Sequence, residues 1–164
     1  MKRLMQRLLM PLALLSLTAC PKPGLIEDVR PYAPELRQTT EAFLNGFFAL
    51  DMTQTMNASA TPFFLDRKAV IGYSEEWAAV LSSLFRENKR TAWKLTGWRA
   101  LSAPEASLLI ADYWNVLQSS QFHEKIYALA EIEVASSPPY QERILLIFDR
   151  PNPQSPWKVV GFVR

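Results

Sequence analysis

The stretch EAFLNGFFALD, residues 41–51, decides the fold expected for this chain. Its large apolar side chains recur at the spacing of three and four residues that gives a helix one apolar face. These side chains are Phe43, Leu44, Phe47 and Phe48. Upstream, Pro34 suits the first turn of a helix. We therefore expect a long first helix over residues 34–50 that buries an aromatic stripe.

Shorter helical segments are expected after the first helix. Asp51 or Thr53 can cap a short second helix, and residues 61–65 are expected to form one more apolar turn. A third helix is expected after Gly72, with Ser74 as its N-cap.

Beyond Lys89 the apolar period falls to two, and β-branched and aromatic residues become frequent. Short turn-rich links separate the segments, which favours antiparallel neighbours. Gly97 is expected to mark a β-bulge. The expected strands are residues 91–101, 107–118, 122–135, 140–149 and 157–163. Helices followed by a meander of about four to five strands predict an α+β fold.

This order of elements resembles the NTF2-like or cystatin-like cone. The resemblance rests on residues 41–51, on the apolar turn around Phe63 and Phe64, and on the closing strand at 157–162. It implies a domain over residues 34–164 in which the helices pack into the concave side of a strongly bent antiparallel sheet. Cones of this family often pair through the outer face of the sheet, which implies a homodimer.

A leader precedes the expected domain. Lys2, Arg3 and Arg7 give it a positive start, and the apolar run at residues 8–17 is too short to span a bilayer as a helix. These features predict a secretory signal peptide.

The leader ends in Leu17-Thr18-Ala19-Cys20, which resembles the lipobox of bacterial lipoproteins. The resemblance implies removal of residues 1–19 and acylation of the Cys20 sulfur. An ordinary signal peptide cleaved near a cysteine is the alternative. Pro21, in place of the aspartate that commonly marks inner-membrane retention, implies an anchor on the periplasmic face of the outer membrane.

Removal of the leader changes the charge balance. It takes three basic and no acidic residues from the chain and leaves 15 basic against 16 acidic residues. Nucleic-acid binding is not expected, because it depends on clustered basic side chains. No cysteine other than Cys20 exists, so no disulfide is expected. The proline-rich residues 20–33 are expected to form a short tether.

His123 is the only histidine, so any histidine-based catalysis would depend on it. No spacing motif for metal ligands surrounds it, and we expect a solvated side chain, no metal and no cofactor.

Asp112 is the candidate general base. In a regular strand it shares a side with Ile110 and Trp114, where a carboxylate would either face a pocket with a raised pKa or pair with Arg99 or Lys94.

Several aromatic side chains are candidates for the lining of an apolar pocket, although they equally suit the core between sheet and helices. They are Trp93, Trp98, Trp114, Tyr127 and Phe148.

Two classes of function fit these observations. The favoured one is a membrane-anchored envelope lipoprotein whose domain binds a small apolar ligand or an envelope protein without catalysis. The alternative is a small cone-fold isomerase or hydro-lyase that uses Asp112 on an apolar substrate.

Overall fold

The computed structural model describes residues 28–66, 69–120 and 122–164. The helices in these ranges are α1 (Ala33–Ala49), α2 (Met52–Ala58), α3 (Ser74–Glu87), α4 (Ala103–Leu109) and α5 (Ala111–Ser119), with 3₁₀ turns η1 (Arg30–Tyr32) and η2 (Phe122–Glu124). The strands are β1 (Ser59–Leu65), β2 (Ala69–Ile71), β3 (Trp93–Leu101), β4 (Ile126–Val134), β5 (Tyr140–Asp149) and β6 (Lys158–Val163). None of these helices is long and apolar enough to cross a membrane.

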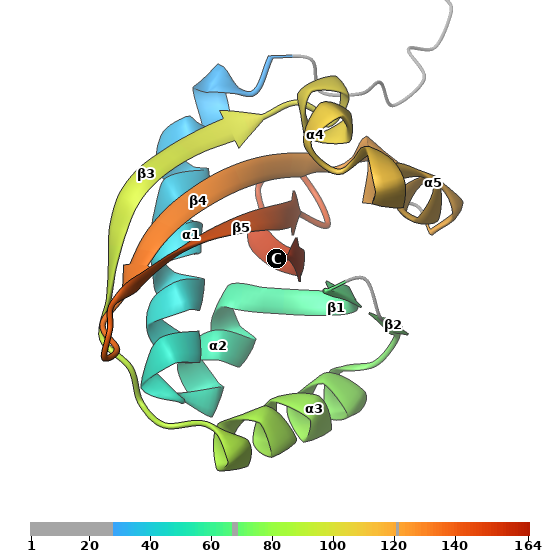
Figure 1. Cartoon of the computed structure of the whole chain (residues 1–164). Coiled ribbons are helices and arrows are strands. Elements are labelled where there is room, and N and C mark those ends of the chain that lie inside the picture. Colours follow the sequence, from blue (N-terminus) through green and yellow to red (C-terminus); the bar gives the residue numbers. More distant parts are fainter. Residues whose placement is uncertain (1–27, 67–68, 121) are drawn as a thin grey trace, which may run out of the picture.

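The strands form one strongly curved sheet in the order β2-β1-β6-β5-β4-β3 (Figure 1). All neighbours are antiparallel except β1 and β6, which run parallel. The α+β class is confirmed. The expected count of four to five antiparallel strands is corrected to six strands in a mixed sheet, because β1 forms where an apolar turn was expected over residues 61–65 and β2 is an additional short strand.

Two adjacent phenylalanines of β1 are buried on opposite faces of the sheet. Phe63 belongs to the core on the inner side of the sheet, and Phe64 belongs to the core on the outer side. Successive side chains of a strand point to opposite faces, so a strand covered on both faces buries both rings.

The expected strand over residues 107–118 is wrong, because this segment forms α4 and α5. A capping box starts α4: the backbone N–H and the hydroxyl of Ser102 donate to Glu105 Oε2 at 2.7 and 2.8 Å. Pro104 stands in the first turn, where a helix tolerates it. The local chemistry of the helix start therefore outweighs the β-rich composition that follows.

Of three further local predictions, two are confirmed and one is wrong. The side chain of Asp51 caps α2 by accepting from the Gln54 N–H at 2.9 Å. The register of β3 against β4 shifts between Leu95 and Gly97, which confirms the expected bulge. Ser74 is the first residue of α3 rather than its cap, and Tyr73 occupies the cap position.

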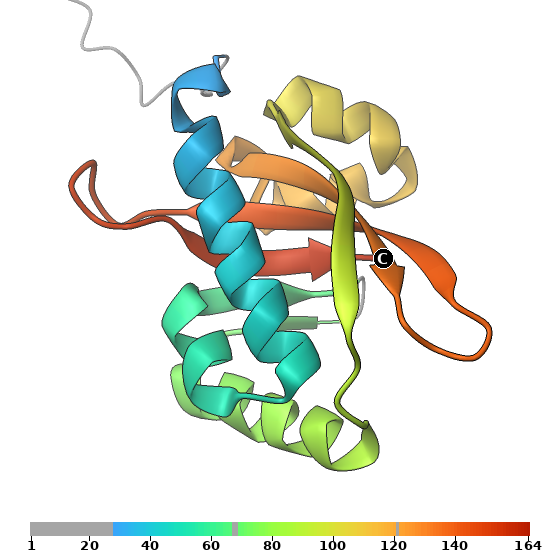
Figure 2. The same ribbon diagram turned by 90° about the vertical axis from the view of Figure 1, so that its left-hand side faces the viewer.

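The sheet separates two apolar cores. The inner core packs α1, α2 and α3 against the concave face, where Trp77 stacks on Phe63 with ring centroids 4.0 Å apart. The outer core packs α4 and α5 against the other face, around Leu117 and Tyr127. Figure 2 shows α1 lying along the inner side of the sheet, with α4 and α5 beyond one end of the strands.

The described domain begins before residue 34. Val29 is buried in the inner core, and the ring of Tyr32 lies edge-on to Trp157 at 5.4 Å. Residues 28–33, assigned to the tether on their prolines, therefore pack on the domain. The leader, the lipobox and Cys20 lie outside the described residues.

Candidate functional site

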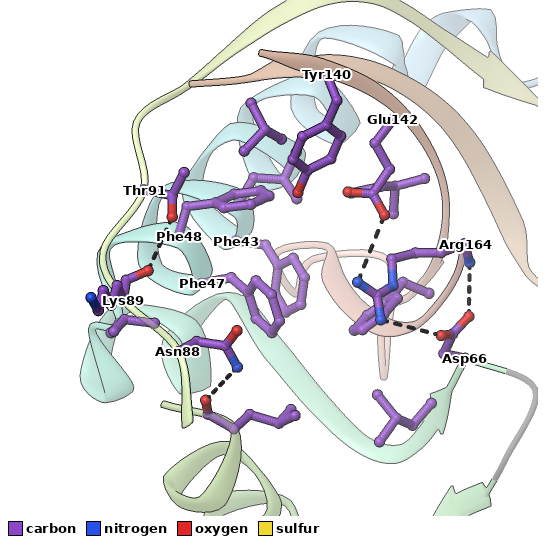
Figure 3. A pocket seen from close by; sticks show the side chains of 17 residues that line it. Phe43, Phe47, Phe48, Asp66, Asn88, Lys89, Thr91, Tyr140, Glu142 and Arg164 are labelled. Atoms are coloured by element: carbon purple, nitrogen blue, oxygen red, sulfur yellow. Dashed lines mark hydrogen bonds and ion pairs between the residues drawn. The ribbon is translucent and has the colours of Figure 1, made fainter. Parts of the chain in front are cut away.

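A cavity of about 280 Å³ opens between the second half of α1, the end of α3 and the ends of several strands (Figure 3). We call it the mouth cavity. It is lined by Phe43, Leu44, Phe47, Phe48, Leu50, Leu65, Asp66, Leu84, Asn88, Lys89, Thr91, Val134, Tyr140, Glu142, Ile144, Phe162 and Arg164.

Aromatic rings form the floor of the mouth cavity. Phe43 and Phe47 lie one turn apart on α1, and their rings stack at 6.0 Å. The Phe47 ring also meets Phe162 of β6 and Phe85 of α3, both at 5.9 Å. Rigid rings from α1 and β6 thus form the floor, and Phe85 of α3 packs against Phe47 without lining the cavity.

One side of the cavity carries a charged cluster, the Arg164 triad. The guanidinium of Arg164 lies 3.5 Å from a carboxylate oxygen of Asp66 and 3.7 Å from one of Glu142. The carboxylate side chains are only 18% and 21% exposed, whereas Arg164 is 53% exposed. The backbone N–H of Arg164 also donates to Asp66 at 2.9 Å.

Backbone geometry helps to hold the triad. Asp66 has a φ of 36°, in the left-handed region that aspartate tolerates better than most residues. Its N–H donates to the carbonyl of Phe162 at 2.9 Å, which fixes the end of β1 beside the end of β6. The triad joins two carboxylates to one guanidinium, so this side of the cavity is polar with a formal excess of negative charge.

Polar side chains complete the rim. The hydroxyl of Tyr140 points toward the aromatic floor, and the ammonium of Lys89 points away from the cavity (Figure 3). Asn88 donates its side-chain amide to the carbonyl of Leu84 at 2.7 Å. The cavity therefore combines a wide apolar floor with hydrogen-bonding groups at its edge, which is the usual composition of a small-molecule site.

Sequence comparisons give no relative for this chain: no family model matches it, and no curated protein does. A solved structure does match, that of an NTF2-like protein of unknown function from Pseudomonas putida KT2440. The match has a TM-score of 0.55 at 12% identity and covers 85% of this chain and 87% of that one. The fold is NTF2-like. At this identity the likeness extends to the fold alone.

The aromatic candidates from the sequence do not line the mouth cavity of this NTF2-like cone. Trp93 stacks on Phe48 at 5.9 Å, and Trp98 donates its indole N–H to the Thr40 hydroxyl at 3.0 Å. Both pack against the inner core.

Two further aromatic candidates, Trp114 and Tyr127, lie on the outer face. Trp114 packs on Tyr127 with ring centroids 6.0 Å apart. The Tyr127 hydroxyl donates to the carbonyl of Phe122 at 2.6 Å, and burial raises the pKa of that phenol. In this structure these aromatic side chains, like the buried Phe148, belong to the two cores.

Asp112 is not in a strand. It lies exposed in the first turn of α5, on the outer side of the sheet, and lines none of the principal cavities. It forms no ion pair with Lys94 or Arg99, both of which the structure describes. The premise of a carboxylate beside a pocket is therefore wrong for this residue.

His123 lies in η2, with its Nε2 3.6 Å from a carboxylate oxygen of Glu124. Within the described ranges, no group of three His, Cys, Asp or Glu side chains is close enough to bind a metal ion.

The Arg164 triad was missed by sequence reasoning. Its members come from the ends of β1, β5 and β6, and Asp66 and Arg164 are far apart in the sequence. Only the parallel pairing of β1 with β6, which no local pattern encodes, brings them together.

Proposed function

We propose that this chain is a lipid-anchored protein of the bacterial envelope whose NTF2-like domain binds a small, largely apolar ligand in the mouth cavity without catalysis. One observation carries the binding proposal, namely the aromatic floor bordered by the Arg164 triad. The anchor is the acylated Cys20 that the lipobox resemblance implies, on the periplasmic face of the outer membrane.

The size and lining of the cavity indicate the ligand class. At about 280 Å³ the cavity is near the lower end of the range for small-molecule sites, roughly 300–1,000 Å³. Contact with the floor removes apolar surface from water, which contributes about 25 cal/mol for each Å² buried. The Arg164 guanidinium is already paired with Asp66 and Glu142, so it favours a ligand with a neutral hydrogen-bonding group over a strong anion.

Binding is favoured over catalysis for a reason of chemistry. Both carboxylates beside the cavity are engaged in ion pairs with the Arg164 guanidinium, so neither stands as a free carboxylate over the aromatic floor. The isomerase or hydro-lyase alternative depends on Asp112, and no observation favours it. An envelope protein could also bind here, by inserting an apolar side chain that packs on the same aromatic floor.

Native mass spectrometry of the purified full chain tests the ligand proposal. We expect the chain to retain a small molecule in a one-to-one complex. Leu84→Trp should abolish this retention, because Leu84 lines the cavity and a larger ring fills it. Val70→Trp is the matched control, since Val70 is exposed on β2 and does not line the cavity. Equal occupancy in both variants, or an empty wild-type chain, would contradict ligand binding.

The anchor is tested separately. Cys20→Ser should abolish incorporation of labelled fatty acid during growth, because the thiol is the acceptor. If the variant were still lipid-labelled, the lipoprotein proposal would fail while the cavity proposal would stand.

A further inference from the structure

Helices α4 and α5 expose large aliphatic side chains on the outer side of the molecule. Leu108 is 83% exposed, Leu109 is 47% exposed and Val116 is 45% exposed. The opposite side of the same helical pair is buried, with Ala106 and Leu117 in the outer core. A pair of helices that only covered a core would carry polar residues at the exposed positions. We call Leu108, Leu109 and Val116 the outer patch.

The charge of this segment does not favour attraction by anionic headgroups. Residues 102–120 contain Glu105 and Asp112 and no basic residue. Trp114, partly buried on α5, is of a type enriched at the boundary between water and hydrocarbon. The surface therefore suits apolar insertion into an uncharged lipid interface.

The position of the outer patch relates it to the anchor. The described chain starts at the end of the molecule where α4 and α5 lie, and both views agree on this (Figures 1 and 2). Cys20 precedes Asp28 by eight residues. A chain of that length spans at most about 29 Å, whatever conformation it adopts.

We propose that α4 and α5 dock on the bilayer that holds Cys20, with the outer patch inserted at the interface between headgroups and acyl chains. The proposal rests on the acylation included in the proposed function, because the short tether keeps this end of the domain near the lipid. Docking in this way places α3, at the opposite end of the molecule, away from the bilayer (Figure 1).

Depth-dependent quenching tests the docking. The lipidated chain carrying Leu108→Cys is labelled with an environment-sensitive fluorophore and reconstituted in phosphatidylcholine vesicles. Acylation occupies the sulfur of Cys20, so the new thiol is the single labelling site. Tyr73→Cys is the matched control, since Tyr73 is 69% exposed beside α3. We expect spin-labelled lipids to quench the label at position 108 several-fold more than the label at position 73.

Equal quenching at the two positions would overturn the docking. A disulfide between two unlabelled Leu108→Cys chains, together with an unquenched label in the labelled sample, would place a second copy on the patch and also overturn it. Mass measurement of the N-terminal peptide records acylation of Cys20 independently. An acylated chain with an unquenched label therefore refutes the docking alone. An unacylated chain refutes the anchor, and because its Cys20 thiol would also take the label, the docking is then measured in a chain that carries both Cys20→Ser and Leu108→Cys.

Discussion

The two faces of the sheet are both covered by helices, but with different side chains. The inner face is packed by aromatic rings from α1, α3 and β1, whereas α4 approaches the outer face through the small side chains of Ala103 and Ala106. Rigid rings leave the mouth cavity at the open end of the cone. Small side chains let α4 approach the sheet closely. Leu108 and Leu109 lie on the other side of this helix and stay exposed to solvent. The same sheet thus presents a hollow on one side and a projecting apolar patch on the other.

The inner face should contribute more stability per residue. Trp77→Ala removes a buried indole that stacks on Phe63 and donates to the Ser59 hydroxyl at 2.9 Å. We expect a loss of about 3–5 kcal/mol in the free energy of unfolding, measured by denaturant titration. Trp77→Phe keeps the stacking and should lose clearly less. Equal losses in the two variants would mean that the hydrogen bond, rather than the packing, holds this side.

The outer face gives a smaller effect at one of its most buried positions. Leu117→Ala should lower the free energy of unfolding by about 2–4 kcal/mol, because Leu117 is fully buried between α5 and the sheet. Leu108→Ala, at an exposed position on the neighbouring helix, should change it by less than about 0.5 kcal/mol. If the two substitutions had equal effects, α4 and α5 would not pack on the outer face as described.

The start of α4 makes the outer face sensitive to pH. Hydrogen bonds from the Ser102 N–H and hydroxyl lower the pKa of Glu105 below its ordinary value of 4.5. A depressed pKa in the folded state contributes stability that is complete above pH 4.5 and is lost as the pH falls below that value. Glu105→Ala should therefore cost about 1 kcal/mol at pH 7. The gap between wild type and variant should close in acid, and a gap independent of pH would contradict the capping role.

The smallest effect is expected at Asp112. Its carboxylate is exposed in the first turn of α5, so Asp112→Asn should change the free energy of unfolding by less than about 0.5 kcal/mol. Ligand occupancy of the mouth cavity, measured by native mass spectrometry, should stay unchanged. Loss of the ligand in this variant would mean that Asp112 takes part in ligand binding. The ligand site would then not be confined to the inner side of the sheet.

The sequence predicted the inner side of the molecule better than the outer side, for a physical reason. The apolar stripe of α1 repeats over several turns, and β5 has the same bounds in the structure as in the prediction. In residues 103–119, two short helices divide the chain, so no helical period extends far enough to outweigh the β-rich composition. The capping box at Ser102 and Glu105 was the one local signal of a helix there.

The site itself was the least predictable part. The aromatic residues of its floor on α1 were predicted to be buried in the core. A repeat of apolar residues does not show whether the space that they face is filled or hollow, so the cavity itself was not predicted. The Arg164 triad depends on strand ends that come together only in the folded sheet. Long-range pairing, not local pattern, therefore decides where polar groups meet the floor.

The place of β6 in the sheet has a consequence for the order of folding. β6 lies between β1 and β5, and Phe64 pairs with Gly161, which is 97 positions later in the chain. A Cβ on Gly161 would come within 2.8 Å of the Phe64 carbonyl oxygen, so this closure also needs a residue without a side chain. Until the last strand arrives, β1 and β5 each keep an unpaired edge on the side that β6 will occupy. Pairing over such a sequence distance is slow. A nascent chain cannot complete this sheet before β6, residues 158–163, has been made.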